Sequence, residues 1–201
     1  MNMKAHSIRA IAFVTLSLGL LYVQTARAQR QGQPEQQEQP HQRGPSTPDE
    51  RTRAVKIAHE LENEPLSKDA KENRDWVIQW IVDIPDITVT VCDEYFGTLT
   101  KPIRGHVREI VNQMVISSAA YMIEHPDKMK DEQAIATAGL LGSLKTYQAI
   151  LKQEPEARWP YIDKIVLMRD QGKLDDFVSD TRRKCAQEEE EPDPDTIRAA
   201  R

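Results

Sequence analysis

The chain has 201 residues and a formal net charge of −5, with 39% hydrophobic and 29% charged residues. This length is enough for one domain with a hydrophobic core. An acidic chain without a basic stripe is poorly suited to binding nucleic acid or an anionic membrane surface, so the sequence argues against both kinds of partner.

The first 28 residues have the features of a secretory signal peptide. Lys4 and Arg9 charge the amino-terminal end, and residues 10–23 form a weakly polar to apolar run. Ala26 and Ala28 then occupy the two small-residue positions of an A-x-A cleavage site. A helix of this length spans about 21 Å, less than the ~30 Å core of a bilayer, which favours a cleaved signal over a membrane anchor. We expect an exported protein, periplasmic or secreted, with no membrane attachment after cleavage.

The two ends of the mature chain have biased compositions. Residues 29–46 are rich in Gln, Pro and Gly and contain no large apolar side chain, and residues 188–201 begin with a run of glutamates. Such segments bury too little apolar surface to offset the entropy that is lost on ordering. We expect both segments to be disordered and to flank a single helical domain at residues 47–187.

The domain is expected to begin with a well-capped helix. Thr47, Pro48 and Glu50 provide an N-cap, a proline at the first helical position and an acid three residues after the cap. Apolar residues recur on one face of the following segment, and Pro65 ends it. These signals predict a helix from about residue 48 to about residue 64.

A second helix is expected between Ser67, which is placed to cap it, and Pro85. Trp76 and Trp80 are four residues apart and therefore share one face of this helix. Further apolar residues extend the same stripe, so we interpret the pair as core rather than as a platform on which a ligand stacks.

Four more helices are predicted by hydrophobic periodicity and by helix-start signals. Their expected ranges are about 102–124, 131–154, 160–172 and, as a short last helix capped by Asp175, about 175–185. Gly139, Gly142 and Ser143 are small, so a neighbouring helix is expected to approach closely there. About six helices with short loops and little strand predict an all-α fold, packed as a bundle or as an array of helical hairpins.

The segment 83–97, DIPDITVTVCDEYFG, departs from this helical pattern. It alternates β-branched residues with polar ones, which predicts an extended segment with one inward and one outward face. The residues expected inward are Ile87, Val89 and Val91, and those expected to face water are Asp86, Thr88 and Thr90. Because no second strand is predicted, we expect an extended connector rather than a sheet.

Cys92 and Cys185 are the two cysteines of the chain. Their spacing excludes C-x-x-C redox chemistry. In an exported chain two cysteines are most simply explained by one disulfide, so we predict a Cys92–Cys185 bond. A cysteine–histidine nucleophile is the alternative, because such pairs meet only in the folded protein.

The sequence predicts no metal or cofactor. It contains none of the common nucleotide-binding, hydrolase or metalloprotease motifs, and no two histidines have helical ligand spacing. We interpret His59 as a helix-surface residue, although with Glu62 or Asn63 it would form a weak metal-binding face. The other histidines of the mature chain are His41 in the leader, His106 near Arg104 and Arg108, and His125 at a helix end.

We therefore favour a non-enzymatic role, as an interaction or structural module for an unidentified protein or peptide partner, and assign no catalytic residue. One alternative is a carboxylate-dependent hydrolase that uses acids of the 83–97 segment, namely Asp83, Asp86, Asp93 and Glu94. A second alternative is a small periplasmic stress-type chaperone. Acids that converge in a cleft would favour the enzyme, and an exposed apolar groove would favour a binder or chaperone. The oligomeric state is left open.

Overall fold

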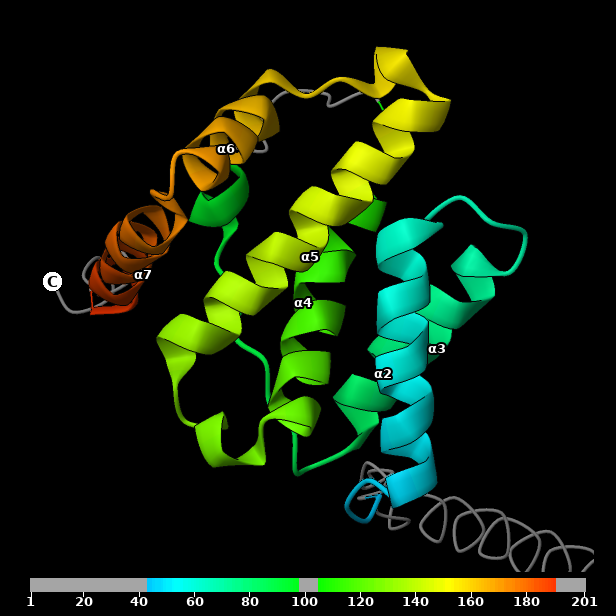
Figure 1. Ribbon diagram of the computed structural model, residues 1–201. Helices are drawn as coiled ribbons and strands as arrows, with labels where there is room; N and C mark the ends of the chain where they lie inside the picture. The colour runs from blue at the N-terminus through cyan, green and yellow to red at the C-terminus, as the bar shows by residue number, and fades with distance from the viewer. Residues whose placement is uncertain (1–42, 98–104, 191–201) are drawn as a thin grey trace, which may run out of the picture. The chain divides into compact units, whose positions relative to one another are not determined.

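The computed structural model describes residues 43–97 and 105–190, which form six α-helices and three short 3-10 helices with no strand among them (Figure 1). The predicted all-α fold is confirmed. The predicted signal peptide, most of the predicted leader and residues 191–201 lie outside the described residues. The helices are α2 (Pro48–Asn63), α3 (Ala70–Asp83), α4 (Val107–Glu124), α5 (Glu132–Gln153), α6 (Pro160–Asp170) and α7 (Leu174–Glu190), and the 3-10 helices are η1 (Asp93–Phe96), η2 (Pro126–Lys128) and η3 (Pro155–Ala157).

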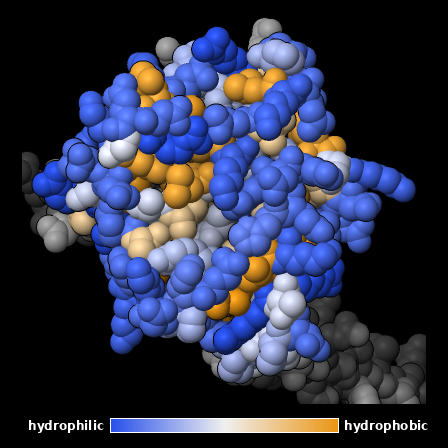
Figure 2. Space-filling model, in the orientation of Figure 1, coloured by the Kyte–Doolittle hydropathy of each residue, from blue (hydrophilic) through white to orange (hydrophobic). Residues whose placement is uncertain are grey.

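Helices α4 and α5 form the central pair of this domain, and the other helices pack against them. Helix α2 contacts both, α3 contacts α2 and α4, and α6 and α7 contact α5 from the other side (Figure 1). Buried side chains form two clusters, one under α2, α3 and the later part of α4, and one among η1, the early part of α4, α5, α6 and α7. On the face in Figure 2 hydrophilic residues predominate, and apolar side chains show mainly in the seams between helices.

Several predicted helix starts are confirmed. Thr47 caps α2 through a complete capping box with Glu50, and Pro48 occupies the first turn. Asp131 caps α5 by accepting a hydrogen bond from the Ala134 N–H at 3.0 Å. These signals involve residues close in sequence, and the local hydrogen bonds that they predict are the ones that form.

Three other predicted starts are wrong. Helix α3 begins at Ala70, because residues 64–69 form turns in which the Ser67 carbonyl accepts the Ala70 N–H. Helix α4 begins at Val107 rather than near residue 102, because Gly105 has a φ of 102°, outside the helical region. Helix α7 begins one residue earlier than expected, at Leu174, whose side chain is buried. Asp175 therefore lies in the first turn of the helix instead of capping it. Helix α7 also continues to residue 190, three residues into the predicted tail.

The two tryptophans of α3 differ in burial. Trp80 is 2% exposed and belongs to the core, as predicted. Trp76 is only partly buried, and the prediction that both are core residues is wrong for it. The two rings stack with centroids 5.9 Å apart, and the Arg53 guanidinium lies 3.8 Å from the centroid of the Trp76 ring. Arg53 thus covers the outer face of the stripe by a cation–π contact.

Within residues 43–97 and 105–190, no helix is both long enough and apolar enough to cross a bilayer.

Candidate functional site: a groove beside an extended connector

The segment between α3 and η1 is an extended connector, as the alternating sequence predicts. Ile87 is buried, and Val89 and Val91 are partly buried against the two core clusters. Thr88 and Thr90 are exposed on the opposite face. The connector, residues 86–92, therefore has one face attached to the core and one face open.

The connector is held at its carboxyl-terminal end by the two cysteines. Cys92 and Cys185 lie at disulfide distance, with Sγ atoms 2.10 Å and Cα atoms 6.1 Å apart, which supports the predicted pairing. The adjoining η1 places Tyr95 in the core, where its ring makes an edge-on contact with Phe177 of α7. The end of the connector is thus fixed to α7 both covalently and by packing.

The other end of the connector is held by Asp86. Its Oδ1 accepts the Ser46 N–H at 2.8 Å, and its Oδ2 accepts the Ser46 hydroxyl and an Arg51 guanidinium N–H at 2.6 Å each. Burial of Asp86 opposes its ionisation, but these hydrogen bonds outweigh burial and lower the pKa to about 2. The prediction that Asp86 faces water is wrong, because its side chain is partly buried against Ser46 and Arg51. These two residues lie near Asp86 only in the folded chain.

Between these two attachments, no backbone N–H or C=O of residues 87–91 is hydrogen-bonded to another residue in the part of the chain that the structure describes. An extended segment with unpaired backbone groups has the properties of an edge strand, to which another chain can be added.

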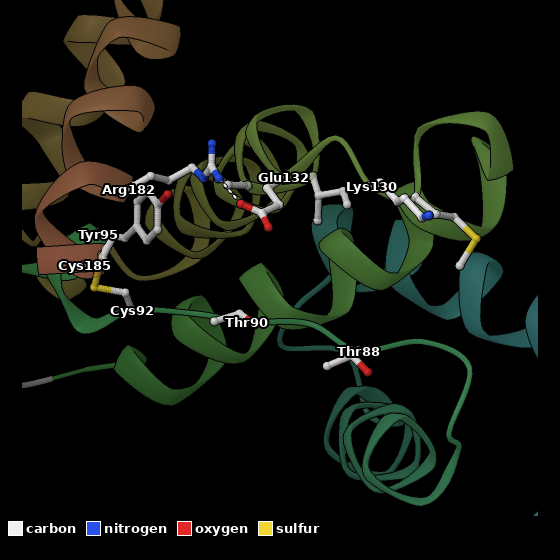
Figure 3. A pocket seen from close by; sticks show the side chains of 12 residues that line it. Thr88, Thr90, Cys92, Tyr95, Lys130, Glu132, Arg182 and Cys185 are labelled. Carbon is white, nitrogen blue, oxygen red and sulfur yellow. Dashed lines mark hydrogen bonds and ion pairs between the residues drawn. A yellow bond between two sulfur atoms is a disulfide. The ribbon is translucent and has the colours of Figure 1, made fainter. Parts of the chain in front are cut away.

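A groove of about 660 Å³ runs along the open face of the connector (Figure 3). This volume lies within the range of ligand-binding sites, about 300–1,000 Å³. Thr88 and Thr90 form one side, and Glu132 and Arg182 lie across from them (Figure 3). The remaining lining residues are Cys92, Tyr95, Met129, Lys130, Ile135, Ala136, Cys185 and Ala186.

The two basic side chains that line the groove differ in whether they form an ion pair. Arg182 forms an ion pair with Glu132, whereas Lys130 has no ion-pair partner among residues 43–97 and 105–190. The Tyr95 hydroxyl is buried and has no hydrogen-bond partner within the same ranges. Burial raises the Tyr95 pKa to about 12, although the nearby Arg182 opposes this shift. Counting partners only among these described residues, the groove has one positive charge outside an ion pair and one hydroxyl without a hydrogen-bond partner in its wall.

The four acids of the hydrolase alternative are not brought together in this groove, since none of them lines it. Asp86 is engaged by Ser46 and Arg51, and Asp83 accepts a hydrogen bond from Gln79 on its own helix. Asp93 is exposed, and Glu94 is partly buried in η1. The structure thus does not bring these acids into the paired arrangement that a carboxylate-dependent hydrolase needs.

Two histidines in the described part of the chain, His59 and His106, contact acids. His59 is on the surface, as predicted, with Nε2 3.0 Å from Glu124, and the hydrogen bond to Glu124 raises the pKa of His59. His106 precedes α4 and its Nε2 lies 2.9 Å from Glu154 Oε2, so the ring contacts an acid although Arg104 and Arg108 are close to it in sequence. Among the residues with described positions, no three His, Cys, Asp or Glu side chains are grouped as a metal site would require.

A buried polar network among α2, α4 and α5 was missed in the sequence. Glu62 is 6% exposed; its Oε1 accepts the Ser117 hydroxyl at 2.8 Å, and its Oε2 accepts from Lys145 at 3.0 Å. Gln113 donates to the Ser117 Oγ and to the Ala58 carbonyl, at 3.0 Å each. The sequence feature that could have indicated this network is the position of Glu62. It lies four residues after Ala58 and therefore on the apolar face of its helix. This network joins three helices and lies apart from the groove.

The sequence matches no protein-family model, and comparisons with curated proteins and with solved structures find no similar protein. The class of the protein therefore rests on the fold and the site, which define a disulfide-linked helical domain with a groove beside an extended edge.

Proposed function

We propose that this protein is an exported binding module and that the groove beside residues 86–92 receives a protein or peptide partner. The observation that carries the proposal is a groove of about 660 Å³ along the open face of a connector whose backbone groups pair with no other residue within 43–97 and 105–190. A protein normally protects such an edge by pairing, covering or charging it. An edge left open beside a cavity of ligand-binding size is therefore well suited to recognition.

Export is part of the proposal. The A-x-A site at Ala26 and Ala28 follows a short apolar run, as in secretory signal peptides. The Cys92–Cys185 pair agrees with this, because disulfides persist mainly in oxidising compartments outside the cytosol.

The two alternatives have weaker support. A hydrolase would need two free carboxylates in the cleft, and the acid in the lining, Glu132, is paired with Arg182. A chaperone would need a continuous apolar surface. The large apolar side chains exposed in the described part of the chain are Val82 on α3, Met129 after η2 and Leu167 on α6, and of these only Met129 lines the groove.

The test is photo-crosslinking in cells that produce the protein naturally. A photo-reactive amino acid at Thr90 places the probe in the groove, and the same amino acid at Lys56, an exposed position on α2 outside the groove lining, is the matched control. The proposal predicts a discrete crosslinked product from position 90, in the exported fraction, that position 56 does not give. Absence of a product from position 90, or the same products from the control, would contradict it.

A further inference from the structure

The Cys92–Cys185 bond lies in the wall of the groove. Both cysteines line the groove, and both are only partly buried. In Figure 3 the two sulfur atoms lie at the end of the row of connector side chains that runs through Thr88 and Thr90. Thiol–disulfide exchange requires that a thiolate reach one of the two sulfur atoms. A groove of about 660 Å³ gives a small thiol this access without unfolding of the domain.

The bond joins two segments that are otherwise held loosely. Among the residues of α7 whose burial is described, the last buried one is Thr181, and residues 182–187 are partly buried or exposed. Residues 88–92 of the connector are likewise partly buried or exposed. Segments with few buried contacts open locally at low free-energy cost. Cleavage of the bond would therefore release both segments from each other.

The parts of the chain next to these segments are attached to the core independently of the bond. Tyr95 of η1 is buried, and the Tyr161 hydroxyl of α6 donates to the Glu94 carbonyl at 3.1 Å. At the other end of the connector, Ile87 is buried. We therefore expect cleavage to free residues 88–92 and the end of α7 while the rest of the domain stays folded.

We infer that the Cys92–Cys185 bond is a redox-sensitive fastening, which a dithiol cleaves in the folded protein so that the connector separates from the end of α7. The inference rests on the proposed function and specifies how binding to the groove is regulated. The oxidised form presents the groove with a fixed wall. The reduced form loses this wall and with it the arrangement of lining residues that the partner contacts.

The reaction is an ordinary two-step exchange. A thiolate of the dithiol attacks one of the two cysteine sulfur atoms, which forms a mixed disulfide and releases the other cysteine as a thiolate. The second thiol of the reductant then attacks the mixed disulfide, releases the remaining cysteine and closes the reductant's own disulfide. The two cysteines take up the two protons that the dithiol loses. Two electrons pass from the dithiol to the protein, and the reverse reaction restores the bond.

Reduction of the oxidised full chain by dithiothreitol, without denaturant, tests access through the groove. Free thiols are alkylated at successive times and counted by mass spectrometry. Attack through the groove predicts the same rate in the native protein and in Gly142→Ala, because Gly142 does not line the groove and its substitution crowds the contact between the central helices. A bond reached only after global unfolding would be reduced about tenfold faster in a destabilised variant, and this result would overturn the inference.

The urea dependence of the same rate is a second measurement. Below the unfolding transition, attack through the groove predicts a rate that is nearly independent of urea. A rate that rises steeply with urea in this range would show that the chain must unfold first, because global unfolding exposes a large surface and responds strongly to denaturant. That result would also overturn the inference.

Amide hydrogen exchange tests whether release is local. In the protein held reduced by dithiothreitol, the amides of residues 182–187 should exchange about tenfold faster or more than in the oxidised protein, and those in the middle of α4 and α5 should stay strongly protected. In the paired Cys92→Ser, Cys185→Ser variant, dithiothreitol should change nothing. Unchanged exchange at residues 182–187, or loss of protection throughout α4 and α5, would refute a local release.

Photo-crosslinking from Thr90 connects the bond to binding. In the paired serine variant the crosslinked product should fall about fivefold or more relative to the native protein, with helical content retained by circular dichroism. An undiminished product, or a variant that does not fold, would overturn the inference and leave the proposed function in place. Absence of the product from the native protein would instead remove the proposed function and, with it, the regulatory role of the bond.

Discussion

Gly142 of α5 lies so close to Ser117 of α4 that a Cβ atom at position 142 would be 2.0 Å from the Ser117 Oγ and 2.4 Å from its Cβ. The same atom would be 2.9 Å from Glu62 Oε1. The absent side chain therefore sets the separation of the two central helices and leaves room for the hydrogen bond between Ser117 and Glu62.

Gly142→Ala should lower the free energy of unfolding by about 1–3 kcal/mol, because the helices must separate or the network must shift. Urea denaturation measures the change. Gly44→Ala is the control, since nothing lies within 4 Å of a Cβ at that position, and it should change stability by less than about 0.5 kcal/mol. Equal losses of stability in the two variants would show that the close approach of Gly142 to Ser117 does not restrict the packing of α4 against α5.

Lys145→Ala should destabilise the protein by about 1–2 kcal/mol, because it removes a hydrogen bond to the buried carboxylate of Glu62. Lys56→Ala removes a comparable pair with Glu60 on the exposed surface of α2, and should cost less than about 0.5 kcal/mol. Denaturation of the two variants under the same conditions gives the comparison. A cost at position 145 no greater than that at position 56 would mean that the network does not contribute to stability.

Asp86 should make the protein sensitive to acid. Its pKa is about 2 in the folded state and about 3.9 in an unfolded chain, so its stabilisation is present above pH 4 and is lost as the pH falls through about 2. After allowance for solvent screening this amounts to about 1–2 kcal/mol.

Asp86→Asn should remove this stabilisation at pH 6 and change stability much less at pH 2. Thermal denaturation at both pH values measures it, and Asp83→Asn controls for the loss of one negative charge. An equal loss of stability at both pH values would show that the ionised Asp86 carboxylate is not the source of this stabilisation.

Removal of the Cys92–Cys185 link should lower the free energy of unfolding by about 2–4 kcal/mol, because the bond closes a loop with a sequence separation of 93. Paired Cys→Ser substitutions and reduction of the native protein should give the same loss in urea. Two titratable thiols in the denatured, unreduced protein would show that the bond is not formed.

Short-range features could be predicted from the sequence because their causes are local. The capping box of Thr47 and Glu50 depends on residues three apart, and it is present. The close approach at Gly139 and Gly142 follows from the absence of side chains, whatever packs against them. The cysteine pairing could be predicted because an exported protein is expected to form disulfides, and a chain with two cysteines can form only one internal disulfide.

The features that the sequence did not reveal depend on tertiary contacts. Arg51 and Asp86 are 35 residues apart, and no local pattern indicates that they meet. The groove is assembled from the connector, the turn before α5, and α5 and α7, so no single segment signals it. The start of α4 depended on the backbone conformation of Gly105, which periodicity does not report.

Amide hydrogen exchange of the free protein tests most directly the central claim, that the extended connector has backbone groups free to take part in binding. The amides of residues 87–91 are expected to exchange rapidly and those in the middle of α4 and α5 to be strongly protected, because the helical amides are hydrogen-bonded and those of residues 87–91 have no partner within residues 43–97 and 105–190. Strong protection of residues 87–91 in the free protein would show that their backbone groups are already paired, and would contradict the account.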